Sequence, residues 1–282
     1  MPPREVTYAV SAHPRGVMTT ADPLGHWASR TSLHDEVGRE LLIFTAASGT
    51  RTSRPCADGV WRPADIPVAD AARGALDAFA GWAVSTADQE LAAALLAAGS
   101  QRVRHARLMT HDLATLPTAP PTALAIEPLD ADAVLRNAGR LGEIAFAAYP
   151  VGHPDHSHEA AAQAIGEIAA IGRGDLLGPV MTQSRLARHQ GAIVGACLVV
   201  DRKGQAPDSG PWVIELFRDP ASTVRGVGEA LMLATLTAAR ETGLPSVSLV
   251  VSDLNTAAIH LYSHLGFIEA EQSWTLSLPA TP

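Results

Sequence analysis

The sequence predicts a fold of the α/β (α+β) class, because apolar strand-like runs alternate with helical segments through its second half. Hydrophobic residues make up 47% of the 282 residues, which is enough for a sizeable core. Two apolar runs meet at Gln190-Gly191 and predict a hairpin there. In chain order we expect strand 122–128, helices 130–147 and 158–171, strands 184–189 and 192–200, a strand from 212, a helix, a strand from 247, a helix from 255 and last strands over 267–278.

The first of these helices has a recognisable start and one apolar face. Asp130 is placed to cap it, because an aspartate oxygen can accept a hydrogen bond from a free N–H of the first turn. The apolar positions of this helix recur at helical spacing, at Val134, Leu135, Leu141, Ile144 and Ala145.

A glycine-rich turn lies between the strand from residue 212 and the helix that follows it. The turn reads Thr223-Val-Arg-Gly-Val-Gly228. Glycines allow close approach of the backbone, and unpaired N–H groups at a helix N-terminus point toward an anion. Arg225 can add a charged contact to a phosphate. The turn therefore predicts a phosphate-binding loop, although a glycine turn alone is a weak signal.

The C-terminal helix carries the most specific pattern of the chain. The segment Asn255-Thr-Ala-Ala-Ile-His-Leu-Tyr-Ser-His-Leu-Gly-Phe267 follows the apolar run Val247–Val251. Asn255, Ala258 and Tyr262 are spaced by three and four residues, so they share one helix face. Together with the upstream glycine turn, this segment resembles the GNAT superfamily of acetyl-CoA-dependent N-acyltransferases, whose pattern is N-x-x-A-x-x-L-Y-x-x-x-G-F.

The resemblance covers roughly residues 122–278 and implies a mixed, mostly antiparallel sheet with helices on both faces. It also implies acetyl-CoA as the acyl donor, with no metal, and a general-acid role for Tyr262 toward the sulfur. Thr223 departs from the Gln or Arg usual at its position, so a side-chain contact is lost or altered there. The residues that the resemblance assigns to the cofactor are Leu216, Phe217, Arg218, Thr223, Val224, Arg225, Gly226, Val227, Gly228, Glu229, Asn255, Ala258 and Tyr262.

Two regions are candidates for the acceptor site. Glu215 is the one carboxylate within the strand from residue 212, and it can deprotonate or hold an ammonium group. The loop 148–158 joins the first two helices, where the resemblance places the acceptor pocket, and is rich in histidine and aspartate. An acceptor loop, a metal site and a solvated loop are all compatible with this composition. The substrate-binding candidates are Tyr149, His153, Asp155, His156 and Glu215.

The N-terminal half resembles a degenerate copy of the same fold. The proline-rich stretch 116–121 is typical of a linker, which predicts domains at 1–115 and 122–282. Val84–Gly99 aligns with Val251–Gly266 without a gap, with Asp88 at the position of Asn255 and Leu95 at that of Tyr262. The N-terminal half lacks the glycine turn, so we expect it to be inert.

Charge and composition limit the partners. The net charge is −8, and residues 121–282 carry 10 basic and 17 acidic groups. An acidic half argues against nucleic acid and favours a cationic acceptor. We find no membrane-spanning run and no signal peptide, and only Cys56 and Cys197, so a cytoplasmic protein is expected, with homodimer formation left open.

The leading functional hypothesis is an N-acetyltransferase that acts on a primary amine of a small molecule in a ternary complex, with an aminoglycoside-type antibiotic as the candidate acceptor. A mycothiol synthase-like tandem is the alternative enzyme, since it also consists of two such halves. A protein lysine or N-terminus is a further acceptor, and a non-catalytic sensor of acetyl-CoA or an amine is the alternative without catalysis.

Overall fold

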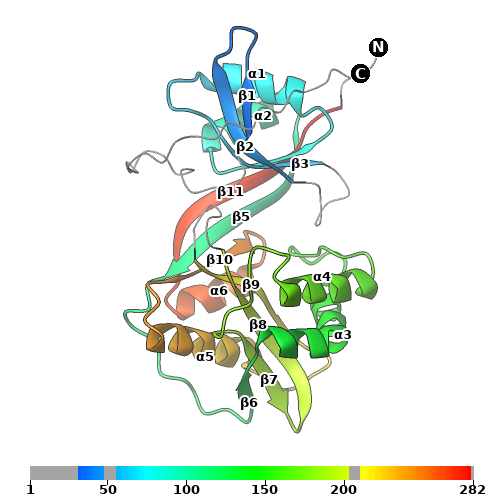
Figure 1. The fold of residues 1–282 in the computed structure, drawn as a ribbon, viewed down its shortest axis with the longest axis vertical. Helices are drawn as coiled ribbons and strands as arrows, with labels where there is room; N and C mark the ends of the chain where they lie inside the picture. Colours follow the sequence, from blue (N-terminus) through cyan, green and yellow to red (C-terminus); the bar gives the residue numbers. More distant parts are fainter. Residues whose placement is uncertain (1–30, 48–54, 203–209, 281–282) are drawn as a thin grey trace. The chain divides into compact units, whose positions relative to one another are not determined.

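The computed structural model describes residues 31–47, 55–202 and 210–280 (Figure 1). The chain forms two compact units, one built from residues up to 106 and from 271 on, the other from residues 107–270. We call them the N-terminal and the C-terminal unit. The division falls inside two strands, β5 (Gln101–His111) and β11 (Ile268–Ser277), and not at the predicted linker. The predicted assignment of residues 271–282 to the second domain therefore differs from the compact units.

The C-terminal unit is built on a mixed sheet with the predicted majority of antiparallel pairs. Strands β6, β7, β8 and β9 pair antiparallel in sequence order, and β9 pairs parallel with β10. The end of β5 follows β10, where Thr110 Oγ1 lies 2.9 Å from Ser248 Oγ. The strands are β6 (Ala125–Pro128), β7 (Arg185–His189), β8 (Ala192–Asp201), β9 (Pro211–Arg218) and β10 (Val247–Ser252).

Helices cover both faces of this sheet, as predicted. Alternate residues of β8 enter two separate cores, because successive side chains of a strand point to opposite faces. Leu198 and Val200 pack with Leu141 of α3 on one face, while Cys197 and Val199 pack with Leu231 of α5 on the other. The helices are α3 (Ala131–Ala148), α4 (Ala161–Arg173), α5 (Val227–Glu241) and α6 (Thr256–His264) (Figure 1). None of the helices in the described residues is long and apolar enough to cross a bilayer.

The start of α3 is as predicted, and that of α4 is not. Asp130 accepts a hydrogen bond from the N–H of Ala133 at 2.7 Å. The second helix begins at Ala161 and not at His158, because the Gln163 side chain accepts from the N–H of Glu159 and closes the first turn there. His158 instead contacts Glu167 of α4, with 3.0 Å between Nε2 and Oε2.

The N-terminal unit is a smaller α/β assembly. Its strands β1, β2 and β3 pair antiparallel, β3 pairs parallel with β4, and β4 pairs antiparallel with β11. The core beneath α1 and α2 includes Leu91, Leu95 and Leu276. The elements are β1 (Thr31–His34), β2 (Glu40–Ala47), β3 (Cys56–Trp61), α1 (Val68–Ala78), β4 (Ala83–Thr86) and α2 (Gln89–Ala97).

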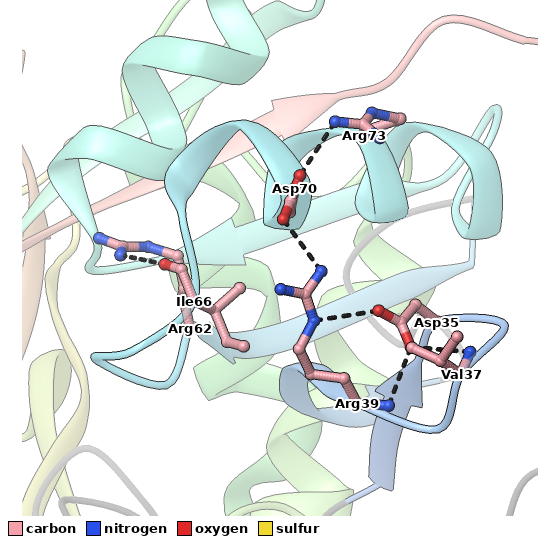
Figure 2. Close-up of polar contacts among 7 residues, drawn as sticks. All are labelled: Asp35, Val37, Arg39, Arg62, Ile66, Asp70 and Arg73. Atoms are coloured by element: carbon pink, nitrogen blue, oxygen red, sulfur yellow. Dashed lines mark hydrogen bonds and ion pairs between the residues drawn. The ribbon is translucent and has the colours of Figure 1, made fainter.

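A chain of ion pairs joins the β1–β2 turn to the start of α1 (Figure 2). Arg39 lies 3.0 Å from both Asp35 and Asp70, and Asp70 also pairs with Arg73. The backbone N–H of Arg39 is the largest of the contacts that hold the pKa of Asp35 below its ordinary value. The Arg39 and Arg73 side chains are exposed, so these pairs orient the turn but add little to stability.

The two units share an internal repeat. In chain order, β1 to β5 and β7 to β11 follow the same plan: three antiparallel strands, a helix, a strand parallel to the third, a second helix and a long strand. The bounds of α6 lie 167 residues after those of α2, from 89 to 256 and from 97 to 264, as the gapless alignment predicts. Gly99 and Gly266, at aligned positions, both have positive φ angles, 95° and 96°.

The contact between α3 and α4 predicts a sharp effect of one methyl group. A Cβ at Gly142 would lie 2.5 Å from Ile165 Cα, so Gly142→Ala forces the helices apart. We expect the free energy of unfolding to fall by about 2 kcal/mol in chemical denaturation. Gly139→Ala is the matched control, because Gly139 lies on the exposed side of α3 and a Cβ added there would meet no atom of another element within 4 Å. It should raise stability by about 0.5–1 kcal/mol, and equal effects of both changes would contradict the packing argument.

Candidate functional site

The glycine-rich turn forms a hollow at the N-terminus of α5. Gly226 caps this helix with a φ of 74°, a left-handed conformation that glycine adopts without strain. The free N–H groups of the first turn of α5 make this a site suited to an anion, and two arginines add positive charge. The hollow has a volume of about 310 Å³ and is lined by Arg218, Pro220, Ser222, Thr223, Val224, Arg225 and Gly226.

A second feature lies beside this loop, where strands β9 and β10 part. Within the described residues, their parallel register consists of Ser248 with Trp212 and Leu249 with Val213, although both strands continue. The β8–β9 ladder shifts at the same level: Leu198 pairs with Glu215 and Val199 with Val213, so Ile214 is the extra residue of a bulge. A bulge bends and twists its strand, which explains why β9 leaves β10 here.

The ladder shows which groups face the parted edge of β9. Asp219 N–H donates to the carbonyl of Val194 at 2.8 Å, so this pair is a hydrogen-bonded one. In an antiparallel ladder the hydrogen-bonded pairs alternate, so Glu215 and Phe217 direct their backbone groups at β8. Leu216, between them, directs its N–H and C=O away from β8, toward the gap. The Tyr149 hydroxyl donates to this carbonyl at 2.7 Å.

Tyr262 lies on α6 in the core of the same unit. Its side chain is 8% exposed and its ring lies 5.7 Å from that of Phe267. Burial raises the pKa of the phenol well above its ordinary value, and the neighbouring groups Cys197, Asp155 and Glu215 add to the rise. The hydroxyl is therefore protonated at neutral pH, as it would be at its ordinary pKa, and this is the state that a general acid requires.

Asn255 joins α6 to the α3–α4 loop. Its Oδ1 accepts from the N–H of Ala258 at 3.2 Å and caps the helix. Its Nδ2 donates to Asp155 Oδ2 at 2.7 Å, and Asp155 Oδ1 also accepts from the N–H of Ser252 at 3.3 Å. The asparagine of the sequence pattern therefore holds the helix start and a loop carboxylate together.

Two histidines of the α3–α4 loop are bound within it. His156 Nδ1 lies 2.7 Å from the carbonyl of Tyr149, so this nitrogen carries the proton. The His153 ring lies 5.1 Å from that of Tyr149, and its Nδ1 accepts from the N–H of Asp155. In the part of the chain that the structure describes, no group of three or more His, Cys, Asp or Glu side chains could hold a metal ion.

The structure brings most of the predicted site residues into two neighbouring groups. The loop residues Thr223 to Glu229 lie at or in the start of α5, while Tyr149, Asp155, Glu215, Leu216 and Tyr262 gather where β9 and β10 part. The peptide of Ala258 is bound by Asn255, and Phe217 is buried in the core beneath α3 and α4. The contacts of Asp155 with Ser252 and Asn255 were missed, since no local pattern links residues about 100 positions apart.

Comparison with known proteins agrees with this arrangement. Residues 140–267 match the acetyltransferase (GNAT) family, so the second half of the chain contains a GNAT domain. The match includes the α3–α4 loop, the glycine-rich turn and the α6 pattern. The predicted GNAT-type sheet is confirmed by this match and by the solved structures described next.

Among curated relatives, the mycothiol acetyltransferase of Acidimicrobium ferrooxidans is 35% identical over 86 residues, which are 29% of this chain and 27% of that protein. The mycothiol acetyltransferase of Streptosporangium roseum is 51% identical over 49 residues, 17% of this chain and 14% of that protein. The chain thus matches little more than a quarter of these relatives' length at most.

Two solved structures share the fold over most of the chain. A GCN5-related N-acetyltransferase from Sphaerobacter thermophilus has a TM-score of 0.60 at 17% identity, covering 89% of this chain and 82% of that one. A tandem GNAT protein from the clavulanic acid biosynthesis pathway has a TM-score of 0.55 at 15% identity, covering 95% and 90%. The likeness to a tandem protein supports the predicted GNAT-like N-terminal half.

The double role of Asn255 predicts that its loss costs more than an ordinary helix cap. Asn255→Ala removes the cap and the partner of a carboxylate, so the free energy of unfolding should fall by about 2–3 kcal/mol. Asp130→Ala, which removes only an exposed cap of α3, should lower it by about 1 kcal/mol. Equal losses in denaturant melts would show that the contact with Asp155 contributes no stability.

Proposed function

We propose that this chain is an acetyl-CoA-dependent N-acetyltransferase that transfers an acetyl group to a primary amine of a small molecule by direct attack in a ternary complex. The observation that carries the proposal is the arrangement of three features in one unit. These are a hollow with two arginines at the start of α5, an open edge of β9 beside it, and the buried Tyr262, which the charge of Glu215 on β9 reaches.

The donor fits these features part by part. The pyrophosphate of coenzyme A would lie on the N–H groups of the turn, with Arg218 and Arg225 adding charge. The amide groups of the pantetheine arm would pair with the N–H and C=O of Leu216, which face the gap. The side chain of Thr223 offers a hydroxyl where related proteins have a longer side chain, so binding relies on the backbone donors.

Two residues supply the acid and base that the transfer needs. Glu215 holds the incoming ammonium and takes its proton, directly or through water, because only a neutral amine attacks a carbonyl. Tyr262 returns a proton to the leaving thiolate, since its phenol is protonated at neutral pH. Asp155, His153 and His156, from the α3–α4 loop, complete the acceptor side in this scheme.

The curated relatives favour one acceptor over the others. Matched relatives are named mycothiol acetyltransferase, and a structurally similar protein is a tandem GNAT, so the amine precursor of mycothiol is the first acceptor that we propose. The aminoglycoside-type acceptor rests only on the acidic charge of the second half.

We further propose that the N-terminal half, predicted as domain 1–115, binds no donor of its own. Its α1 occupies the place of α5 in the repeat, yet it begins after Pro67, with a φ of −59° and no glycine turn. A proline has no N–H to offer an anion. The catalytic domain, predicted as 122–282, would therefore hold the one donor site.

The direct test is release of the coenzyme A thiol from acetyl-CoA against a panel of amines. The panel holds the mycothiol precursor, aminoglycosides, polyamines and lysine peptides. We expect turnover with the mycothiol precursor, the first acceptor that we propose. Binding of acetyl-CoA without turnover on any amine would support a sensor instead, and no binding at all would overturn the proposal.

The role of Tyr262 has its own test. Tyr262→Phe keeps the ring and removes the proton donor, so kcat should fall by about 100-fold, within the usual range for general acid–base catalysis. The Kd of acetyl-CoA, measured by calorimetry, should stay within about two-fold because the phosphate loop is untouched. A variant with the wild-type rate would show that the leaving thiolate needs no acid from this residue.

A further inference from the structure

The segment 149–155 at the start of the α3–α4 loop is fastened at both ends to different elements. At one end the Tyr149 hydroxyl donates to the carbonyl of Leu216 on β9, at 2.7 Å. At the other end the carboxylate of Asp155 accepts from Ser252, the last residue of β10, and from the cap residue Asn255. We call this segment the strap.

The two points of attachment lie on opposite sides of the gap between β9 and β10. These strands are paired at Val213 and Leu249 and then part, while Leu216 and Ser252 each lie three residues further along. The strap therefore bridges the two strands at the level where their own ladder has ended. All of these residues belong to the C-terminal unit.

The strap is also held in shape from within. The N–H of His153 donates to the carbonyl of Pro150 at 2.9 Å, and the N–H of Asp155 to His153 Nδ1 at 3.1 Å. Gly152 has a φ of 91°, which suits the tight turn between the ends. These internal hydrogen bonds fix the length of the strap, so the hydrogen bond at each end restricts movement at the other end.

The bond of Asp155 to Asn255 is the stronger fastening. It is 2.7 Å long and joins a carboxylate to an amide N–H, and hydrogen bonds to ionised groups are stronger than those between neutral groups. The hydrogen bond from Tyr149 joins two neutral groups. Its acceptor is the carbonyl of Leu216, and the N–H of the same residue faces the gap between β9 and β10. Movement of either fastening would open the gap at the place where the acyl group would lie.

We propose that the strap closes the acceptor side of the β9–β10 gap, so that the thioester meets the amine and not water, and that Tyr149 and Asp155 are positioning residues. This inference rests on the proposed function. In the reaction that the strap prevents, water adds its oxygen to the acetyl carbon and the carbon–sulfur bond breaks, which gives acetate, the coenzyme A thiol and a proton. A loosened strap should therefore raise amine-independent hydrolysis while it slows transfer to the amine.

The experiment compares Tyr149→Phe and Asp155→Ala with the wild-type protein and with Val151→Ala, in acetyl-CoA alone. Val151 lies in the strap but its side chain is 88% exposed, so its variant is the matched control. We expect the first two variants to release coenzyme A thiol about 2- to 10-fold faster without amine, the factor that one hydrogen bond's net free energy corresponds to. Val151→Ala should match the wild type. Loss of fold does not raise a hydrolysis rate, so the increase separates positioning from mere destabilisation.

Two further measurements keep the test decisive. With the best amine of the panel, both variants should lower kcat/KM for the amine by about ten-fold, while the Kd of acetyl-CoA stays within about two-fold. If Asp155→Ala does not fold, Asp155→Asn retains one acceptor oxygen and should show a smaller rise in hydrolysis. Variants that bind acetyl-CoA and hydrolyse it at the wild-type rate would overturn the strap's role. A wild-type protein that does not bind acetyl-CoA would overturn the proposed function itself.

Discussion

The end of the pairing between β9 and β10 is the constraint on which the rest of the site depends. A strand can leave one neighbour only if another holds it, and β8, buried on both faces, pairs with β9 along its whole length. The bulge at Ile214 then directs β9 away without breaking that ladder. The backbone groups of Leu216 are left facing a gap inside a folded unit, where a polar group needs a partner. Tyr149 provides one, and the donor's amide groups suit the rest.

The parts of the site that local chemistry determines could be predicted from the sequence. A glycine at the start of α5, a cap before α3 and an apolar face on α3 each depend on residues within one or two turns. The glycine and the cap are where expected, and four of the five predicted apolar positions of α3 are buried, while Leu135 is 40% exposed. The bond between Asp155 and Asn255 could not be predicted, because it depends on how β10 and the α3–α4 loop meet in space. The strand β11 was expected in the second domain, yet its residues from Glu271 on belong to the N-terminal unit, and residues 274–277 pair with β4. A strand's own sequence does not specify which edge it will join.

At one aligned position the two halves of the repeat differ in a single side-chain group, which is a carboxylate oxygen in Asp88 and an amide nitrogen in Asn255. Asp88 and Asn255 occupy the same position and cap α2 and α6 through the same contact. The second oxygen of Asp88 accepts from Arg62 Nε at 2.9 Å, while the amide nitrogen of Asn255 donates to Asp155. The side chain of Asp88 thus accepts a hydrogen bond from an arginine, whereas the side chain of Asn255 donates one to a carboxylate. Because an amide nitrogen can donate to a carboxylate, only Asn255 can hold an acidic loop residue beside the parallel strands of its half.

The membership of β11 in the N-terminal unit affects the order in which the protein can fold during synthesis. Leu276 and Leu278 fill the core beneath α1 and α2, and residues 274–277 complete the sheet beside β4. A ribosome delivers these residues only after the entire GNAT domain has been made. The half that is translated first therefore completes its folding last. Until then it exposes a strand edge and an incomplete core, and such surfaces bind chaperones and aggregate. Shortening the chain by its last dozen residues would damage the half that lies farthest away in sequence.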